Sequence, residues 1–430
     1  MKKRTMLKMF SLIFLAGPAI SASAQTQQEP TPLTRPRTVT QQQQTAPPAA
    51  PTASPATQRA PSTQTPAQTQ EVPTQTRTPV MITAPTAFPV VPLQPLTKLP
   101  ANKVRAKIAE AQRIFKTRPV PTALTSTALD VVTLAALDTE TNKVHLLTLS
   151  KEIFLTKGAA LTLTTSLGSL VQLRILRANG VNTAVTIFDS AGRSLVPLTV
   201  EYPIERGGVF REMAYYTSGH PALLSADIVK AGQSYVYTMV DAAARRLKEK
   251  GVMIAPNIVE VAKRLCIVEH VDHERFKQEN RIALYEEIYS LYALNELDTY
   301  RYSVSIAGAG GMVQMINWAY QTERTRHPGV GLNPDFVLGM RNHGNALEAM
   351  LLYMQDTWND LAGSDDVQYA LNAKLATQTE LLAAGYNSNA AKLPLYIRRG
   401  GASWRTLIPR ETQMYLQIYK SLDSLIPSQK

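Results

Sequence analysis

The sequence predicts a multidomain protein that combines α and β structure. A disordered N-terminal tether is followed by a β-rich accessory module, folded as a sandwich or a barrel, and by an all-α C-terminal domain. Three observations predict this order. Residues 25–100 hold 16 of the 28 prolines of the 430-residue chain, β-branched runs separated by turn residues fill 123–240, and apolar residues recur at helical spacing over 241–430.

The first 24 residues have the pattern of a cleavable signal peptide. A basic start precedes a short apolar core at residues 9–20, and Ala22-Ser23-Ala24 matches the small-residue pattern that signal peptidase accepts. A membrane anchor is the alternative, but this core, interrupted by Gly17-Pro18, falls well short of the ~20 residues that span a bilayer. We therefore expect cleavage after Ala24 and an exported protein, periplasmic or extracellular, with no stable membrane insertion of the mature chain.

Residues 25–100 are rich in Gln, Thr, Pro and Ala, and nothing in them offsets the entropy cost of ordering. We expect a disordered linker with polyproline II character. This segment carries +3 and the first 24 residues +4, which leaves +5 of the formal +12 for the folded part. That mild charge does not predict a nucleic-acid partner. The single cysteine, Cys266, excludes an internal disulfide framework, and its apolar neighbours predict that it is buried.

A helical connector is expected over 101–122, because apolar side chains recur at helical spacing over 101–116, before Pro119. The β-rich accessory module is expected over 123–240. Its predicted strands are 129–136, 143–149, 160–165, 171–177, 183–189, 194–202 and 233–239. No catalytic residue types gather in this module, so structural support and ligand binding are both open roles for it.

The all-α domain is expected over 241–430. Its predicted helices are 241–250, 256–269, 273–296, 311–324, 343–362, 368–384 and 411–425. Gly251 is expected to end the first of these helices, and Pro256 to begin the second, because proline pre-sets the backbone of a first helical turn.

One constellation in this domain points to chemistry. Glu296 ends a predicted helix, and a tight turn of small residues follows at 303–315, which is a way to present a single acid to a groove. This stretch resembles the lytic transglycosylases of the soluble murein type, which share a fold with goose-type lysozyme. In that family a Glu precedes, at a fixed spacing, a Ser, then Ala-Gly-Ala and Gly-Leu-Met-Gln. The positions in register here are Glu296, Ser305, Ala307-Gly308-Ala309, Gly311 and Gln314.

Two further blocks resemble the same family in the right order. Residues 384–389 resemble its Ala-Tyr-Asn-Ala-Gly block, and residues 407–415 resemble its Leu-Pro-x-Glu-Thr-x-x-Tyr block. Asn345 and Ala349 take the places of an Asn and a small residue on the intervening helix. The resemblance covers about residues 265–425. Three positions depart from the family pattern: Leu297 stands where the family has Ser, Met312-Val313 where it has Leu-Met, and Asn389 where it has Gly.

The resemblance implies a lysozyme-like fold and an enzyme that cleaves peptidoglycan glycan strands between MurNAc and GlcNAc without a cofactor. Glycosidic cleavage needs a proton delivered to the leaving oxygen and later removed from the nucleophile, and one carboxyl can do both in turn. Burial beside Met312, Val313 and Met315 is expected to favour the protonated acid. The implied nucleophile is the sugar's own hydroxyl, which gives an anhydromuramyl product.

The resemblance also assigns the catalytic and substrate-binding residues. Glu296 is the implied acid and base, Ser305 would hydrogen-bond the reacting sugar, and Gln314 would line the groove. Tyr386 and Asn387 would hold the bound sugar and its developing positive charge. Peptidoglycan is the expected partner, and no protein partner is indicated. A non-catalytic peptidoglycan-binding or cell-envelope scaffold protein on the same fold is the alternative, and a hydrolase with ordinary reducing ends is a variant of the enzyme.

Other constellations are weaker. Residues 269–274 contain His270 and His273, which could hold zinc on one helical face. A polar helix junction is the preferred interpretation, because no third ligand and no metalloprotease spacing are present, and we expect no metal site. His343 is expected at a helix N-terminus. Ser305 lacks the His and Asp pattern that would make it a nucleophile.

Overall fold

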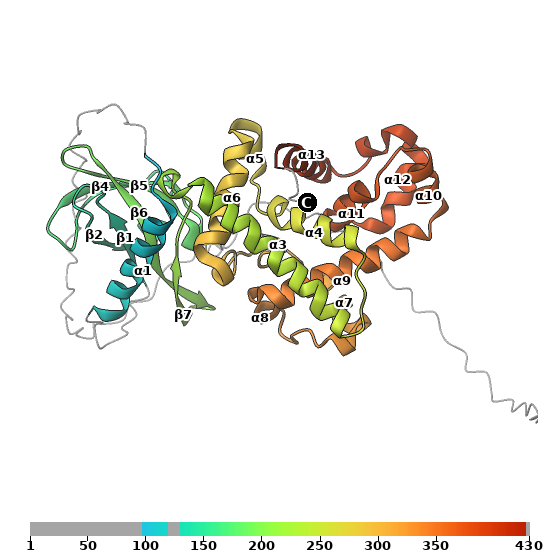
Figure 1. Cartoon of the computed structure of the whole chain (residues 1–430), viewed down its shortest axis with the longest axis horizontal. Coiled ribbons are helices and arrows are strands. Elements are labelled where there is room, and N and C mark those ends of the chain that lie inside the picture. The colour runs from blue at the N-terminus through green and yellow to red at the C-terminus, as the bar shows by residue number, and fades with distance from the viewer. Residues whose placement is uncertain (1–96, 119–129, 427–430) are drawn as a thin grey trace, which may run out of the picture. The chain divides into compact units, whose positions relative to one another are not determined.

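The computed structural model describes residues 97–118 and 130–426 (Figure 1). The predicted signal peptide at 1–24 and the predicted disordered linker up to residue 96 lie outside the described residues. The last four linker residues are described, and they correct its boundary. Leu99 is buried and its N–H donates to the Ala222 carbonyl oxygen at 2.8 Å, so the chain is packed from this point on.

The β-rich module is one antiparallel sheet that nearly closes on itself. Its strands are β1 (Val131–Leu137), β2 (Val144–Ser150), β3 (Ala160–Thr164), β4 (Leu170–Arg177), β5 (Ala184–Asp189), β6 (Ser194–Arg206) and β7 (Val209–Tyr216). They run in the order β2-β1-β6-β5-β4-β3, and β7 also pairs with β6. The Ser166 N–H donates to the Leu146 carbonyl oxygen at 2.9 Å, which joins β2 to the β3–β4 turn at the two ends of this path.

Strand β6 organises the module because its 13 residues pair with three strands in turn. Its first residues pair with β5, its middle with β1, and its second half with β7. The inner side is filled by apolar side chains of all these strands, and helix α1 (Ala101–Thr117) covers the outer side of β1 and β6 (Figure 1). Ile108 and Phe115 of α1 pack there with Leu198. The short helix α2 (Lys151–Phe154) follows β2 and buries Phe154.

The helical region follows β7 in the chain and begins with α3. Its α-helices are α3 (Ala226–Glu249), α4 (Pro256–Val268), α5 (His273–Gln278), α6 (Arg281–Asn295), α7 (Asn317–Arg326), α8 (Phe336–Arg341), α9 (His343–Ala362), α10 (Asp365–Asn372), α11 (Gln378–Asn387), α12 (Leu393–Gly400) and α13 (Arg410–Leu425). Helices α3 and α6 approach closely at Gly232, where an added Cβ would lie 1.7 Å from the Tyr289 carbonyl oxygen. Only glycine allows this packing.

Polar contacts tie the β-rich module to the helical region beside the end of α6. The Asn295 side-chain amide accepts from the Thr217 N–H at 2.7 Å and donates to the Thr217 carbonyl at 2.8 Å. Glu287 lies between Arg177 of β4, at 2.9 Å, and Arg275 of α5, at 2.7 Å. The residue just before Glu296 is therefore anchored to the β-rich module, and so is α6 itself.

Most of the elements predicted from sequence are confirmed, and the misses have identifiable causes. Six strands and the helices at 101–116, 256–269, 343–362 and 411–425 agree within one or two residues, or by a few at the end of β6. The strand predicted at 233–239 is wrong, because these residues lie inside α3, and the predicted module boundary at 240 falls within that helix. Strand β7, after the Gly207-Gly208 turn, was not expected.

Three other helix predictions need correction. The helix predicted at 273–296 is two helices, because Asn280 caps a new one by accepting from the Ala283 N–H at 3.1 Å. The helix predicted at 368–384 also divides, into α10 and α11, and Thr377 begins α11 with a capping box. The helix predicted at 311–324 begins only at Asn317. None of the helices in the described ranges is long and apolar enough to cross a membrane.

Candidate functional site

Glu296 lies in a strained turn directly after α6. Its backbone has φ +46° and ψ −118°, and Asn295 before it still belongs to the helix. Among the described residues five non-glycine residues have positive φ, and three of them, Glu296, Tyr300 and Gln314, lie within this stretch. Such strain persists only where the surroundings impose it, and it concentrates at functional sites.

The carboxyl of Glu296 is exposed to solvent. Within the described part of the chain its carboxylate forms no hydrogen bond or ion pair. The expectation that it is buried beside Met312, Val313 and Met315 is therefore wrong: these three side chains are fully buried, and they form the base of the following turn instead. Glu296 is therefore accessible to solvent in the free protein.

A layer of buried aromatic rings supports the strained turn. Tyr300, itself at φ +55°, stacks on His270 with ring centroids 3.4 Å apart and meets Tyr292 edge-on at 5.5 Å. His270 Nε2 lies 2.9 Å from the Met312 carbonyl oxygen. The chain after Glu296 is thus connected through His270 to the 303–315 turn.

A second support comes from His343, the first residue of α9. Its Nε2 lies 2.8 Å from the Thr299 carbonyl oxygen, so this nitrogen carries the proton, and Nδ1 accepts from the Tyr235 hydroxyl at 3.0 Å. Burial lowers the pKa of His343 to about 4, so the ring is neutral at pH 7. Burial, and then the negative charge of Glu296, raise the pKa of Tyr235. Tyr235 and His343 therefore fix the turn that carries Glu296.

The 303–315 turn is compact and is held together by its own hydrogen bonds. The Ser305 hydroxyl accepts from the Ala309 N–H at 3.0 Å, and the Gln314 amide donates from Nε2 to the Gly311 carbonyl at 2.8 Å. The Gly310 N–H donates to the Met315 carbonyl oxygen at 3.0 Å and closes the turn. Ser305 and Gln314 are both buried, so in this state they hold the shape of the turn.

Gly311 lets this turn sit directly on α8. Its φ is +67°, and an added Cβ would lie 2.2 Å from the Met340 carbonyl oxygen. Glycine is therefore required at this position both by the backbone conformation and by the close approach.

Tyr386 and Asn387, at the end of α11, lie behind the same turn. The Tyr386 hydroxyl donates to the Val313 carbonyl at 2.7 Å. Both polar atoms of the Asn387 side chain are buried, and they have no hydrogen-bond partner among the described residues. The structure thus joins Ser305, Gln314 and Tyr386 through one turn. It shows no hydrogen bond between this turn and the Asn387 side chain.

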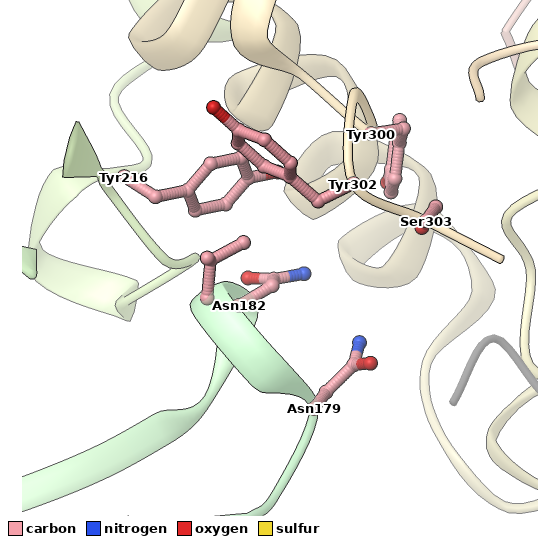
Figure 2. Close-up of a pocket in the computed structure, with 7 residues that line it drawn as sticks. Asn179, Asn182, Tyr216, Tyr300, Tyr302 and Ser303 are labelled. Carbon is pink, nitrogen blue, oxygen red and sulfur yellow. The ribbon is translucent and has the colours of Figure 1, made fainter. Parts of the chain in front are cut away.

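Four large apolar side chains in or next to this stretch of the chain are exposed. Leu297, Val304, Ile306 and Trp318 all expose large apolar side chains, and Ile306 reaches 75 % exposure. Nearby, a small pocket lies between Asn179 and Asn182 of the β4–β5 connection and the chain after α6 (Figure 2). Tyr216, at the end of β7, Tyr302 and Ser303 are also part of its lining. The β-rich module therefore lines one side of a pocket whose other side includes Ser303, two residues before Ser305 in the sequence.

Asp298 is a second carboxyl of this turn, and no motif in the sequence marks it. It is half-buried, and burial raises its pKa, although Arg301 lies 3.4 Å away and opposes the shift. Arg301 and Arg341 both pair with Glu212 of β7, at 3.2 and 2.9 Å. Only its position two residues after Glu296 could have marked Asp298 beforehand.

The remaining sequence candidates have structural roles. The polar helix junction at 269–274 is confirmed, because Asp272 caps α5 and His270 bonds the Met312 carbonyl. His343 begins α9 as predicted, and Cys266 is buried. Asn345 accepts from the Asn333 N–H at 2.8 Å and so secures the loop before α8.

Comparison with known proteins found no matching family model, no matching curated protein and no matching solved structure.

Proposed function

We propose that this protein is an exported enzyme that cleaves the glycan strands of peptidoglycan by the lytic transglycosylase reaction, with a lysozyme-like helical domain and Glu296 as acid and base. One observation carries the proposal. Glu296 is held exposed in a strained turn at a helix end, nine residues before Ser305, in the register of the motif that the sequence resembles. Strain of this kind costs of order 1–3 kcal/mol, and a solvated structural carboxylate gives no reason to retain it.

In the proposed reaction Glu296 first donates its proton to the glycosidic oxygen between MurNAc and GlcNAc. The bond from the muramyl anomeric carbon to that oxygen breaks, and the GlcNAc residue leaves with a hydroxyl. The carboxylate then accepts the proton of the muramyl C6 hydroxyl, whose oxygen bonds to the anomeric carbon and closes the anhydro ring. Glu296 regains its proton, and no water is consumed.

The exposed apolar side chains of Leu297 and Ile306 suit the binding of a glycan strand. A glycan strand lying over Leu297 and Ile306 would cover the Glu296 carboxyl and exclude water from it, an environment that favours a neutral acid. The apolar faces of sugar rings pack well against such side chains. Contacts of the strand with Ser305, Gln314 and Asn387 would require the turn to rearrange on binding, because all three side chains are buried in the free protein.

The test is digestion of purified peptidoglycan sacs by the full chain and by Glu296→Gln, with the released fragments identified by mass. Glu286→Gln is the matched control, because it removes a carboxylate from helix α6, ten residues before Glu296. We expect anhydromuramyl ends from the wild type and from the control, and none from Glu296→Gln.

Other outcomes separate the alternatives. Reducing ends without anhydro ends would show a hydrolase. Binding without release by the wild type would show a non-catalytic wall-binding protein. Loss of release in Asp298→Asn but not in Glu296→Gln would move the acid to the second carboxyl of the turn.

A further inference from the structure

Three side chains with metal-binding atoms meet where the end of α7 packs on α9, in a part of the helical region that the proposed reaction does not use. Glu323 and His327 lie four residues apart at the end of α7, and Asp356 comes from α9. Their ligand atoms all lie within 4.8 Å of one another. His327 Nε2 is 3.0 Å from Asp356 Oδ2 and 3.7 Å from Glu323 Oε2.

Glu323 is the member of this group that needs an explanation. Its side chain is 1 % exposed, and neither carboxylate oxygen has a hydrogen-bond partner among the described residues. An ionised carboxylate taken out of water without a partner is strongly unfavourable, so buried carboxylates are normally paired, protonated or bound to a metal. The fold therefore buries an acceptor beside His327 and Asp356 that requires a cation or a proton.

The geometry fits a small divalent cation. Carboxylate and imidazole ligands bind Zn²⁺ at about 2.1 Å, which places tetrahedral ligand atoms roughly 3.4 Å apart. The two measured separations from His327 Nε2, 3.0 and 3.7 Å, lie on either side of that value. His327 and Asp356 keep side-chain exposures of 21 and 18 %, so a cation can enter from solvent and water can complete its coordination.

The charges around the group also allow a cation. Arg326 approaches Asp356 Oδ2 at 3.4 Å, but it is half exposed and can turn away into solvent. Asp360, one turn further along α9, is exposed and adds negative charge. Without a cation, burial and then the neighbouring Asp356 raise the pKa of Glu323 to about 8. A proton held by Glu323 is therefore the competing state.

We propose that Glu323, His327 and Asp356 form a binding site for one divalent transition-metal ion of the Zn²⁺ or Mn²⁺ class, which fastens the end of α7 to α9. Two oxygen ligands and one imidazole suit such ions. Since α7 begins directly after the 303–315 turn, the ion would stabilise the helix that follows this turn in the chain. The site is separate from Glu296 and takes no part in the proposed cleavage.

The experiment measures metal binding by the full chain, purified without a histidine tag and freed of metal with a chelator. Zn²⁺ and Mn²⁺ are titrated by calorimetry, and bound metal is counted by elemental mass spectrometry. We expect one ion per chain. Thermal unfolding at a metal concentration about 100-fold above the dissociation constant should show a melting temperature raised by about 5 °C.

Variants decide whether the ion sits at this group. Glu323→Gln and His327→Gln should each weaken binding by about 100-fold or more and abolish the thermal shift. Asp360→Asn is the control for Glu323→Gln, since it removes a neighbouring carboxylate charge without removing a ligand, and it should bind within a few-fold of wild type. His327 is partly exposed, so its variant remains informative if Glu323→Gln does not fold.

The proposal is overturned if the wild type binds neither metal, if it binds them no better than the two ligand variants, or if Asp360→Asn loses binding as they do. The first result would leave a protonated Glu323 beside His327 and Asp356 as the state of this group. Because the readouts are stoichiometry and melting temperature, they do not depend on whether the protein cleaves peptidoglycan.

Discussion

The neutral state of His343 makes the stability of the fold dependent on pH in a way that one substitution can isolate. Burial lowers the pKa of this histidine to about 4, whereas the unfolded chain has the ordinary 6.5. The backbone carbonyl of Thr299 opposes this shift and the charge of Arg301 adds to it. The unfolded state therefore binds the extra proton between these values, so stability present above pH 6.5 is lost as the pH falls toward 4.

The size of the effect follows from the two pKa values. At pH 7.5 the histidine contributes almost nothing to the pH dependence, and at pH 4.5 the contribution amounts to about 2.5 kcal/mol of lost stability. Protonation would also remove the acceptor for the Tyr235 hydroxyl, and the turn between Glu296 and Thr299 would lose a support.

The assay is urea unfolding of wild type and His343→Gln at pH 7.5 and 4.5, followed by the circular dichroism of the helices. Carboxylates and His220, whose pKa burial also lowers to about 4, titrate in both proteins and cancel in the comparison. The stability of His343→Gln should fall by about 2.5 kcal/mol less than that of wild type. Asn342→Ala, which removes the α9 cap, is the control and should lose about 1 kcal/mol equally at both pH values. An identical fall in wild type and His343→Gln would refute the reasoning.

Two further predictions concern the anchoring of the site, and both are measured by urea unfolding. Gly311→Ala should destabilise the protein by about 3 kcal/mol or more, because its Cβ would clash with the Met340 carbonyl oxygen. Gly308→Ala is the control: it is also at positive φ but in open space, and it should cost only about 1 kcal/mol. Equal effects of the two substitutions would contradict the close approach at Gly311. Asn295→Ala should cost about 2 kcal/mol through its two bonds to the Thr217 backbone, and an unchanged midpoint would contradict that anchor.

The sequence predicted elements well where local signals and burial agree. Helix α9 was predicted with its exact limits, because Asn342 is a strong cap and the apolar stripe runs without interruption to Ala362. The strand misassigned at 233–239 shows the opposite case. Its β-branched and aromatic residues suit a strand, but packing of Val236 and Val240 into the core decides for the helix.

The candidate site could be predicted in part for a related reason. The spacing from Glu296 to Gln314 lies within one chain segment, so a motif can mark it. Solvent exposure of Glu296 and the support from Tyr235 and His343 depend on which helices pack together. The spacing of residues along the chain does not predict this packing. The group at Glu323 and Asp356 was missed because its members lie 33 residues apart on two helices.

We propose that Glu296 transfers the proton in glycan cleavage. The most direct measurement is the rate at which Glu296→Gln releases fragments from purified peptidoglycan sacs, relative to Glu286→Gln under the same conditions. We expect Glu286→Gln to retain the wild-type rate and Glu296→Gln to be slower by about 100-fold or more. Equal release by the two variants would contradict this proposal.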